Sequence, residues 1–189
     1  IIATYDVDPA RVFVAGLSAG GAMAAVMGAP YPDLYAAVGV HSGLPYRSAA
    51  DLPSAFAAMS GDAGPLGLRS RKSYGAANDG PRIRTIVFHG DADNIVHPSN
   101  AASIVGAAKE GESIERAEAR HTASRAHTRT VTRDKTGKVV AEQWLIHGSG
   151  HAWSGGSRDG TYTDPQGPDA SSEMLRFFLE ARLELAGAK

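Results

Sequence analysis

Short apolar runs alternate with helix-forming stretches along the first half of the chain. Residues 11–15, 35–40 and 84–88 are rich in β-branched and aromatic side chains, and each run is too short for a helix. We therefore expect three buried strands. Residues 22–29 and 99–109, which follow the first and third runs, have the composition of helices. This alternation predicts an α/β fold with a mostly parallel sheet flanked by helices.

A β-hairpin and a final helix are predicted in the second half. Residues 128–133 and 138–146 flank Asp134-Lys135-Thr136-Gly137, in which the glycine supplies the positive φ of a hairpin turn. Apolar residues at helical spacing then mark an amphipathic helix over residues 170–186, which Asp169 would cap. The hairpin adds antiparallel strands to the predicted sheet.

Three other segments complete the pattern. Residues 51–59 are expected to form a short helix, and residues 60–81, rich in Gly, Pro, Ser and Arg, a long loop or cap element. The polar segment 110–127 has no convincing periodicity. No internal repeat, low-complexity tract or second domain is apparent. We therefore expect residues 1–189 to form a single domain.

Composition narrows the class of protein. The 189 residues include 43% hydrophobic residues and no cysteine, and 19 Lys and Arg face 20 Asp and Glu. A chain of this size buries about 70% of its unfolded surface, so it needs no disulfide or metal to stabilise a core. The near-neutral charge argues against nucleic acid or an anionic membrane as partner. No apolar run approaches the roughly 20 residues of a membrane span.

Gly16-Leu17-Ser18-Ala19-Gly20 matches the G-x-S-x-G pattern of a nucleophile elbow. Glycines two residues before and after the serine allow a sharp turn without side-chain collision, so that the serine hydroxyl projects from the sheet edge. The motif lies between a predicted strand and a predicted helix, as this geometry requires. We therefore interpret Ser18 as a nucleophile rather than as part of a purely structural turn.

A serine nucleophile needs a base, and histidine has the pKa that suits this task. Of seven histidines, His151 is the best candidate, because it lies in a glycine-rich loop just after the last predicted strand. His147 ends that strand and is expected to be packed or hydrogen-bonded there. His41, His89 and His97 are expected to line the site from strand ends, and His121 and His127 are expected in solvent.

The loop after the third predicted strand supplies the acid. We assign Asp93 as the carboxylate that orients His151, and Asp91 as a residue that holds the loop by binding backbone amides. A metal site is the alternative interpretation of this cluster. The calcium-loop pattern that begins at Asp91 lacks its glycine at the sixth position and its glutamate at the twelfth, which argues against a metal.

Ser18, Asp93 and His151 follow one another in the order nucleophile, acid, base, each just after a predicted strand. This is the order of the α/β-hydrolase fold and differs from the orders of chymotrypsin and subtilisin. The sequence therefore predicts an α/β-hydrolase that uses a serine nucleophile.

Five longer stretches carry a resemblance to a known family. They are VDPARVFVAGLSAGGAMAAVM, YPDLYAAVGVHSGLPY, VFHGDADNIVHPSNA, GSGHAWSGG and TYTDPQGPDASSEMLRFFL, and together they span nearly the whole chain. They resemble the polyhydroxybutyrate depolymerase family of serine esterases, which is related to feruloyl and acetylxylan esterases. The resemblance implies a triad of Ser18, Asp93 and His151 that works without metal or organic cofactor.

The resemblance also suggests substrates and location. It implies short hydroxyalkanoate polyesters or oligomers, with feruloyl or acetyl esters of polysaccharides as the alternative, and it favours a secreted or periplasmic protein. Trp153, beside the catalytic histidine, is expected near the substrate, although core packing would explain this aromatic residue equally well. His41 and Ser42, at the end of the second strand, are also expected to bind substrate.

One feature departs from the family pattern. The oxyanion hole needs two amide donors, the N–H of Ala19 and another from a loop that precedes the elbow strand by about 60 residues. Only ten residues precede Arg11. We therefore expect this chain to be the C-terminal portion of a family member, with the N-terminal strands and the second donor in a missing segment. The rival hypothesis is a non-catalytic binding or scaffold protein that keeps the fold.

Overall fold

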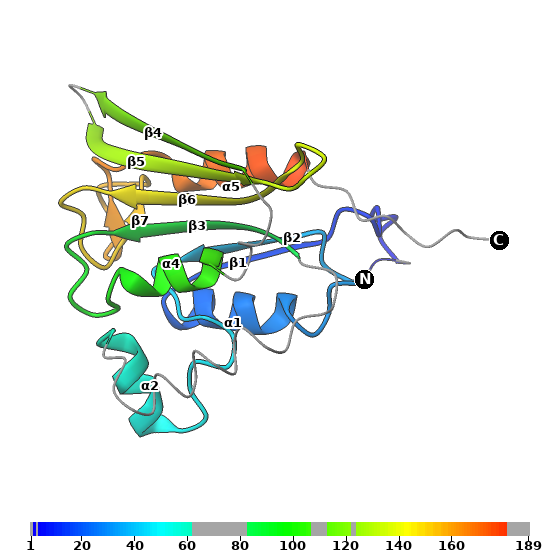
Figure 1. Cartoon of the computed structure of the whole chain (residues 1–189), viewed down its shortest axis with the longest axis horizontal. Helices are drawn as coiled ribbons and strands as arrows, with labels where there is room; N and C mark the ends of the chain where they lie inside the picture. The colour runs from blue at the N-terminus through cyan, green and yellow to red at the C-terminus, as the bar shows by residue number, and fades with distance from the viewer. Residues whose placement is uncertain (1, 3, 62–82, 107–112, 122–123, 181–189) are drawn as a thin grey trace.

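Six strands form the central sheet of the computed structural model, which describes residues 2, 4–61, 83–106, 113–121 and 124–180 (Figure 1). The sheet comprises β1 (Phe13–Leu17), β2 (Ala37–His41), β3 (Arg84–Gly90), β4 (Ser113–His121), β5 (Ser124–Arg133) and β6 (Val139–Ile146). Two short strands, β7 (Trp153–Ser154) and β8 (Thr163–Asp164), pair separately. The described helices are α1 (Ala19–Gly28), α2 (Leu52–Met59), α4 (Ser99–Gly106) and α5 (Ala170–Leu179).

The order of strands across the sheet is β1-β2-β3-β6-β5-β4. β1, β2, β3 and β6 are parallel, and β5 and β4 extend the sheet in antiparallel pairing. The predicted mostly parallel sheet is confirmed. Within the described part of the chain, β1 pairs with β2 alone, so it forms one edge of the sheet.

Helices cover both faces of the sheet (Figure 1). On one face, α1 and α4 pack through Ala24, Ala101 and Val105 against valines of β2 and β3. On the other face, α5 packs with the wholly buried Phe177 against aromatic and aliphatic side chains of β3 and β6. Every residue of β2 is buried, as expected for a central strand with helices on both faces. The two-sided packing explains why these strands read as continuous apolar runs.

The predicted cap at Asp169 is present, and Asp51, for which no cap was predicted, also caps a helix. Asp51 Oδ1 accepts a hydrogen bond from the Ser54 N–H at 2.9 Å, and Asp169 Oδ1 accepts one from the Ser172 N–H at 3.0 Å. These bonds satisfy amides that have no partner inside α2 and α5. The predicted loop over residues 60–81 lies almost wholly outside the described residues, as do the last residues of the helices predicted over 99–109 and 170–186.

The predicted hairpin between β5 and β6 is confirmed. The Asp134 N–H donates to the Lys138 carbonyl at 3.0 Å, and Gly137 has a φ of 87°. At this φ an L side chain would be strained, which accounts for the glycine. The turn connects β5 to β6 and lets the two strands pair antiparallel.

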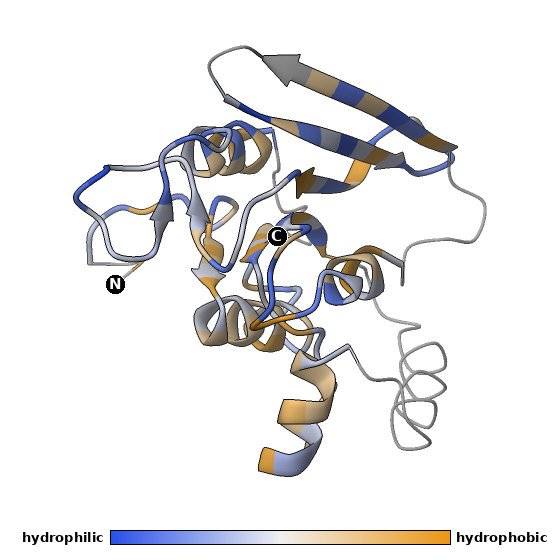
Figure 2. Cartoon of the chain, turned by 90° about the vertical axis from the view of Figure 1, so that its left-hand side faces the viewer, coloured by the Kyte–Doolittle hydropathy of each residue, from blue (hydrophilic) through white to orange (hydrophobic). Residues whose placement is uncertain are grey.

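The polar segment 110–127 differs from expectation, because β4 and the start of β5 run through it. The side chains from Ile114 to Glu118 are exposed, so β4 buries no apolar face that a sequence pattern could reveal. Figure 2 shows β4 and β5 as two paired strands at the periphery of the molecule. His127 was expected in solvent, but it is buried, with its ring 4.9 Å from that of Trp144. Pairing with β6 produces this burial.

A buried carboxylate joins β5, β6 and α5. Glu142 is wholly buried and lies 2.7 Å from both the Arg129 and the Arg176 guanidinium groups, while Trp144 Nε1 donates to it at 3.2 Å. Burial by itself would raise the pKa of Glu142, but the hydrogen bonds from the two arginines lower it below its ordinary value. The ionised group therefore fixes α5 against β6.

Candidate active site

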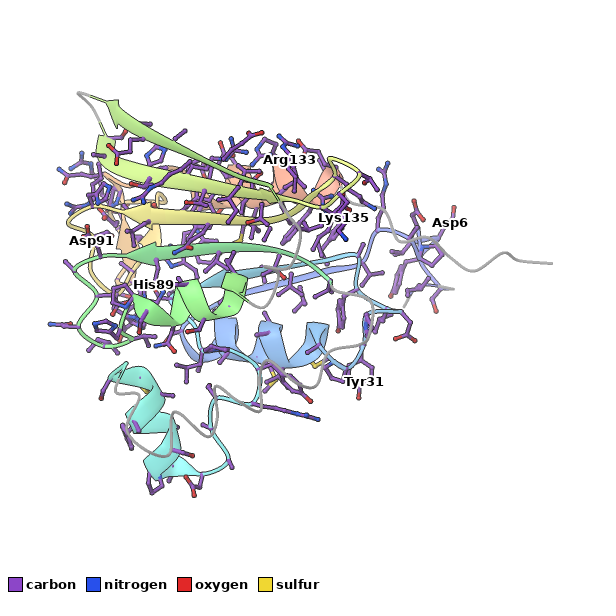
Figure 3. The ribbon with its side chains drawn as sticks, viewed as in Figure 1. Asp6, Tyr31, His89, Asp91, Arg133 and Lys135 are labelled. Atoms are coloured by element: carbon purple, nitrogen blue, oxygen red, sulfur yellow. The ribbon has the colours of Figure 1, made fainter. Side chains whose placement is uncertain are left out.

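The carboxyl ends of the parallel strands lie at one edge of the sheet, and each candidate catalytic residue follows one of them. Ser18 follows β1, Asp93 follows β3 and His151 follows β6. Figure 3 labels His89 and Asp91 at this edge. In open α/β sheets, ligands bind outside the carboxyl ends of the strands. This edge is therefore the candidate active site.

Ser18 lies in a strained turn between β1 and α1. Its φ of 57° and ψ of −118° are a rare combination for an L residue, and such conformations cost about 1–3 kcal/mol. Its N–H donates to the His41 carbonyl at 2.9 Å, and its carbonyl accepts from the Ala22 N–H at 2.9 Å. Ala19 begins α1, so its N–H has no acceptor within the helix. This geometry is that of a nucleophile elbow.

Close backbone packing explains one glycine of the motif but not the other. A Cβ on Gly16 would lie 2.3 Å from the carbonyl carbon of Gly20, whereas a Cβ on Gly20 would meet nothing within 4 Å. A Cβ on Gly21 would lie 2.9 Å from the Gly16 oxygen. The expectation that both glycines flanking Ser18 are needed sterically is therefore correct for Gly16 and wrong for Gly20.

This difference predicts unequal effects of two alanine substitutions. Gly16→Ala should lower the free energy of unfolding by more than about 3 kcal/mol, because no rotamer change can relieve a clash with backbone. Gly20→Ala, the matched control, should change it by less than about 1 kcal/mol. Urea unfolding of the two variants measures this difference, and equal losses would contradict the steric explanation.

Asp93 is a buried carboxylate surrounded by donors. Its Oδ1 accepts from the N–H groups of Ile95 and Val96 at 3.0 and 2.9 Å. Its Oδ2 lies 2.8 Å from His151 Nδ1 and 3.4 Å from His89 Nε2. Burial alone would raise the pKa of Asp93, but hydrogen bonds from His89, Val96, His151 and Ile95 outweigh it and hold the pKa well below its ordinary value. Asp93 is therefore ionised at neutral pH.

The Asp93 carboxylate sets the tautomer of His151. A carboxylate can only accept, so His151 Nδ1 carries the proton and Nε2 is left as a base. The His151 side chain keeps 13% of its surface exposed. Across the described ranges, no hydrogen bond joins Ser18 Oγ to this ring; in unliganded sites such contacts are often longer than in the substrate complex. The structure therefore shows Asp93 bonded to His151, with Ser18 at the same edge of the sheet.

Asp91 and His147 form a second pair beside the first. Asp91 Oδ1 accepts from the Gly148 N–H at 2.7 Å, and Oδ2 lies 2.8 Å from His147 Nδ1. His147 Nε2 lies 2.9 Å from Thr128 Oγ1. Both expectations are confirmed, because Asp91 binds a backbone amide and His147 is a hydrogen-bonded strand-end residue. His147 borders a hollow of about 450 Å³ that Glu118, Ala119, Ala126 and His127 also line.

The loops that carry Asp93 and His151 are joined backbone to backbone. The Asp91 N–H donates to the Ile146 carbonyl, and the Ala92 N–H donates to the Ser149 carbonyl, both at 3.0 Å. A Cβ on Gly90 would lie 2.1 Å from that Ser149 oxygen. Glycine at position 90 is therefore what allows the two loops to approach this closely.

Two supporting residues were not assigned their roles from the sequence. His89 is wholly buried, and its Nε2–H donates to the Val96 carbonyl at 2.7 Å beneath Asp93. Asp164 accepts from Ser149 Oγ at 2.6 Å and from Arg125 Nε at 2.5 Å, so it ties the histidine loop to β5. Asp164 occurs in the family-like stretch TYTDPQG, but no local pattern connects it with a residue 15 positions away.

His41 and Ser42 lie beneath the site. Both residues are wholly buried, and the His41 ring lies 5.8 Å from the Phe88 ring and 5.2 Å from the Trp153 ring. Their expected contact with substrate is therefore wrong, because packing closes both side chains off from solvent. Trp153 is partly buried against the core, and its Nε1 donates to Ser171 Oγ at 3.1 Å. These contacts fit core packing, and a contact of Trp153 with substrate stays a prediction.

The burial of His41 predicts a loss of stability in acid. Burial, followed by the nearby His89 and His151, lowers its pKa from 6.5 to about 3, although Asp93 and Asp164 act in the opposite direction. Between these pH values the unfolded chain binds more protons than the folded one, so the free energy of unfolding rises with pH and levels off above pH 6.5. Protonation of the unfolded chain should remove at most about 3 kcal/mol between pH 7 and pH 4.

Urea unfolding of the wild type and of His41→Gln at several pH values measures this contribution. The variant cannot gain this proton on unfolding, so its free energy of unfolding should fall less between pH 7 and pH 4. Equal falls in the two proteins would contradict the assignment of a neutral, buried His41.

A sequence model described as Esterase PHB depolymerase matches residues 1–129. The chain belongs to the Esterase PHB depolymerase family. Poly(3-hydroxyalkanoate) depolymerase C of Paucimonas lemoignei is 33% identical over 167 residues, which cover 86% of this chain and 38% of that protein. Feruloyl esterase B of Neurospora crassa is 36% identical over 106 residues, which cover 51% of this chain and 36% of that protein. The chain thus spans little more than a third of these relatives.

Solved structures confirm the fold expected for this family. An acetyl xylan esterase from Aspergillus awamori matches 95% of this chain and 63% of its own chain, with a TM-score of 0.62 at 21% identity. A PHB depolymerase from Penicillium funiculosum matches 92% of this chain and 52% of its own, with a TM-score of 0.61 at 18% identity. The predicted α/β-hydrolase fold is confirmed.

The described residues contain no group of three or more His, Cys, Asp and Glu side chains arranged to hold a metal ion. None of their helices has the length and apolar character needed to cross a membrane.

Proposed function

We propose that this chain carries the catalytic residues of a serine carboxylesterase. The contact that supports this most directly is the 2.8 Å hydrogen bond between His151 Nδ1 and Asp93 Oδ2, at the sheet edge where the strained Ser18 turn lies. Family membership supports the same chemistry, since the relatives are named as depolymerases and esterases. The non-catalytic scaffold hypothesis gives no reason for an ionised acid, an oriented base and a strained serine to meet at one edge.

In the first half of the reaction, Ser18 Oγ attacks the ester carbonyl. His151 Nε2 takes the serine proton as the new carbon–oxygen bond forms, and Asp93 stabilises the resulting imidazolium. The Ala19 N–H donates to the oxyanion. When the tetrahedral intermediate collapses, the bond to the alcohol oxygen breaks, and His151 returns its proton to the leaving alkoxide. The products of this half are an acyl-serine and a free alcohol.

In the second half, water hydrolyses the acyl-serine. His151 Nε2 takes a proton from the attacking water, and the oxyanion again binds the Ala19 N–H. The bond between the acyl carbon and Ser18 Oγ then breaks, and His151 protonates the serine oxygen. Ester and water are thus converted to acid and alcohol.

A second oxyanion donor is part of the proposal. Since β1 has a neighbour on one side only in the described part of the chain, we expect the second amide to come from polypeptide that pairs with this free edge. Loss of one oxyanion donor typically costs about 10²–10³ in kcat. Residues 1–189 alone should therefore have a lower kcat than the same residues joined to a segment that pairs with β1 and supplies this amide.

The substrates proposed are oligomers and polymers of 3-hydroxyalkanoates. Poly(3-hydroxyalkanoate) depolymerase C of Paucimonas lemoignei aligns with 86% of this chain, whereas Feruloyl esterase B of Neurospora crassa aligns with 51%. Acetyl or feruloyl esters of polysaccharides are the second candidate, because proteins named acetylxylan and feruloyl esterases are among the relatives.

Competing substrates test this choice. We expect a higher kcat/KM for 3-hydroxybutyrate trimer than for methyl ferulate or acetylated xylo-oligosaccharides, measured with one preparation. A higher value for either carbohydrate-type ester would move the assignment to the second candidate. Absence of hydrolysis of all three, and of p-nitrophenyl butyrate, by a protein that also contains the second oxyanion donor would favour the scaffold hypothesis.

A further inference from the structure

His41 is wholly buried and hydrogen-bonds both to the turn that carries Ser18 and to the loop that carries His151. Its carbonyl accepts from the Ser18 N–H at 2.9 Å, inside the strained elbow. Its Nε2 accepts from the Ser154 N–H at 2.9 Å, three residues beyond His151. Ser18 and Ser154 lie far apart in the sequence, so His41 spans the two segments that must come together for proton transfer.

The Ser154 amide settles the tautomer of His41. A backbone N–H can only donate, so His41 Nε2 is unprotonated and Nδ1 carries the proton. Nδ1–H then donates to Ser42 Oγ at 3.2 Å. The ring is stacked on Phe88 and on Trp153. Burial lowers the pKa of His41 to about 3, which keeps this neutral tautomer at neutral pH.

Three aspartates bind the first half of the histidine loop. Asp91 binds the Gly148 N–H, Asp164 binds Ser149 Oγ, and Asp93 binds the His151 ring. Beyond His151, the backbone N–H of Ser154 donates to His41 Nε2, and the Ser154 hydroxyl donates to the Pro168 carbonyl at 2.6 Å. Pairing of β7 with β8 also holds this segment, through the Trp153 N–H on the Tyr162 carbonyl and the Gly155 N–H on the Asp164 carbonyl, both at 2.8 Å. His41 is the acceptor that joins the segment to the end of β2, the strand end that also binds the Ser18 N–H.

We propose that His41 is a positioning residue, which sets the distance between Ser18 Oγ and His151 Nε2 by fixing the elbow and the histidine loop to the same strand end. The proposal rests on the proposed esterase function. His41 touches no substrate, because it is wholly buried. It acts through its bonds to Ser154 and Ser18. Its Nδ1–H bond to Ser42 keeps the proton on Nδ1, so that Nε2 can accept the Ser154 N–H.

Two substitutions separate the acceptor from the bulk of the ring. His41→Leu keeps about the same volume but removes the acceptor, whereas the Oε1 of His41→Gln can take the place of Nε2. A displacement of about 1 Å in catalytic geometry can cost about 10²-fold in rate. We therefore expect His41→Leu to lower kcat by about 10–100-fold with KM nearly unchanged, and His41→Gln to recover most of that loss.

The assay is p-nitrophenyl butyrate hydrolysis by the full-length protein, with thermal unfolding of each variant. Val40→Ala is the matched control, because Val40 is the preceding buried residue of β2 and its side chain packs on the opposite face. It should lower the melting temperature and leave kcat unchanged. The low-field proton NMR signal of His151 Nδ1–H gives a second readout, which should be lost or shifted in His41→Leu and kept in Val40→Ala.

The possible results separate this proposal from the esterase function. If the wild type hydrolyses the ester through Ser18 and His41→Leu keeps the kcat of Val40→Ala, the positioning role is overturned. If His41→Leu does not fold, Ser42→Ala decides, because it removes the acceptor of Nδ1–H and should lower kcat several-fold at constant KM; an unchanged kcat would overturn the role. If Ser18→Ala hydrolyses the ester as fast as the wild type, the esterase mechanism itself fails.

Discussion

Ser18→Ala is expected to lower kcat/KM for p-nitrophenyl butyrate by about 10⁴–10⁶-fold, because no other group can form the acyl-enzyme. His151→Ala should cause a loss of similar size, since Ser18 without its base is a poor nucleophile. The double variant should lose no more than the worse single variant, because triad residues act as a unit. Steady-state kinetics of the three variants measure these losses.

Ser103→Ala is the control for the first prediction, because Ser103 lies exposed on α4 and its hydroxyl donates to the Ser99 carbonyl of the same helix. It should keep the wild-type rate. If Ser18→Ala kept more than about a tenth of wild-type kcat/KM, a loss of under about 1.4 kcal/mol, Ser18 would not be the nucleophile. A double variant with the product of the two single losses would show that Ser18 and His151 act separately.

Asp93→Asn should lower kcat by about 10⁴-fold, because the amide that replaces the carboxylate can donate to His151 Nδ1 and so favours the wrong tautomer. Asp91→Asn should cost less than about tenfold, since its carbonyl oxygen can still accept from Gly148 and the residue does not touch His151. Asp93 and Asp91 lie in one loop and each binds a histidine, so Asp91→Asn is a matched control for Asp93→Asn. Measurements of kcat at saturating substrate compare them.

The reverse order of losses would move the role of the acid to Asp91 and His147. Equal losses would mean that the Asp93–His151 and Asp91–His147 pairs both hold the loop in place, and that neither carboxylate takes part in proton transfer. A pH profile adds a second test, because in the wild type the pKa of Asp93 is held well below its ordinary value. Activity of the wild type at mildly acid pH should therefore not fall through protonation of this carboxylate.

The candidate catalytic residues could be predicted because their geometry is local. The turn at Ser18 needs Gly16 and a following helix, and both are encoded within a few residues. Asp91 and Asp93 both lie in the loop after β3, and the contact of Asp93 with His151 agrees with the assignment of Asp93 as the acid. Strand ends that meet at one edge made the grouping possible, since parallel strands carry their following loops to the same side.

The supporting residues could not be predicted because long-range packing decides their roles. His41 was expected to touch substrate, but Trp153 and Ser154, more than a hundred residues later, cover it. Asp164 acquires its role only when β8 lies beside the histidine loop and β5. Neither contact leaves a periodic or spaced pattern in the sequence.

The strand β4 illustrates the same limit for the fold. Its exposed, charged residues resemble those of a solvated loop, and its strand form comes from backbone pairing with β5. The neighbouring hairpin turn at Gly137 was predictable, because the positive φ demands a residue type that the sequence displays. A turn that requires glycine can be recognised in the sequence. Backbone pairing such as that of β4 with β5 accepts almost any side chain, so it leaves no such signal.

Mass spectrometry of the acylated protein tests the central claim most directly. The full-length protein is mixed with p-nitrophenyl butyrate, quenched in acid during the burst of p-nitrophenol, and digested. We predict one butyryl group per chain, located on Ser18, and none in the Ser18→Ala variant. Steady hydrolysis with no butyryl group on Ser18, or with the group on another residue, would contradict the account.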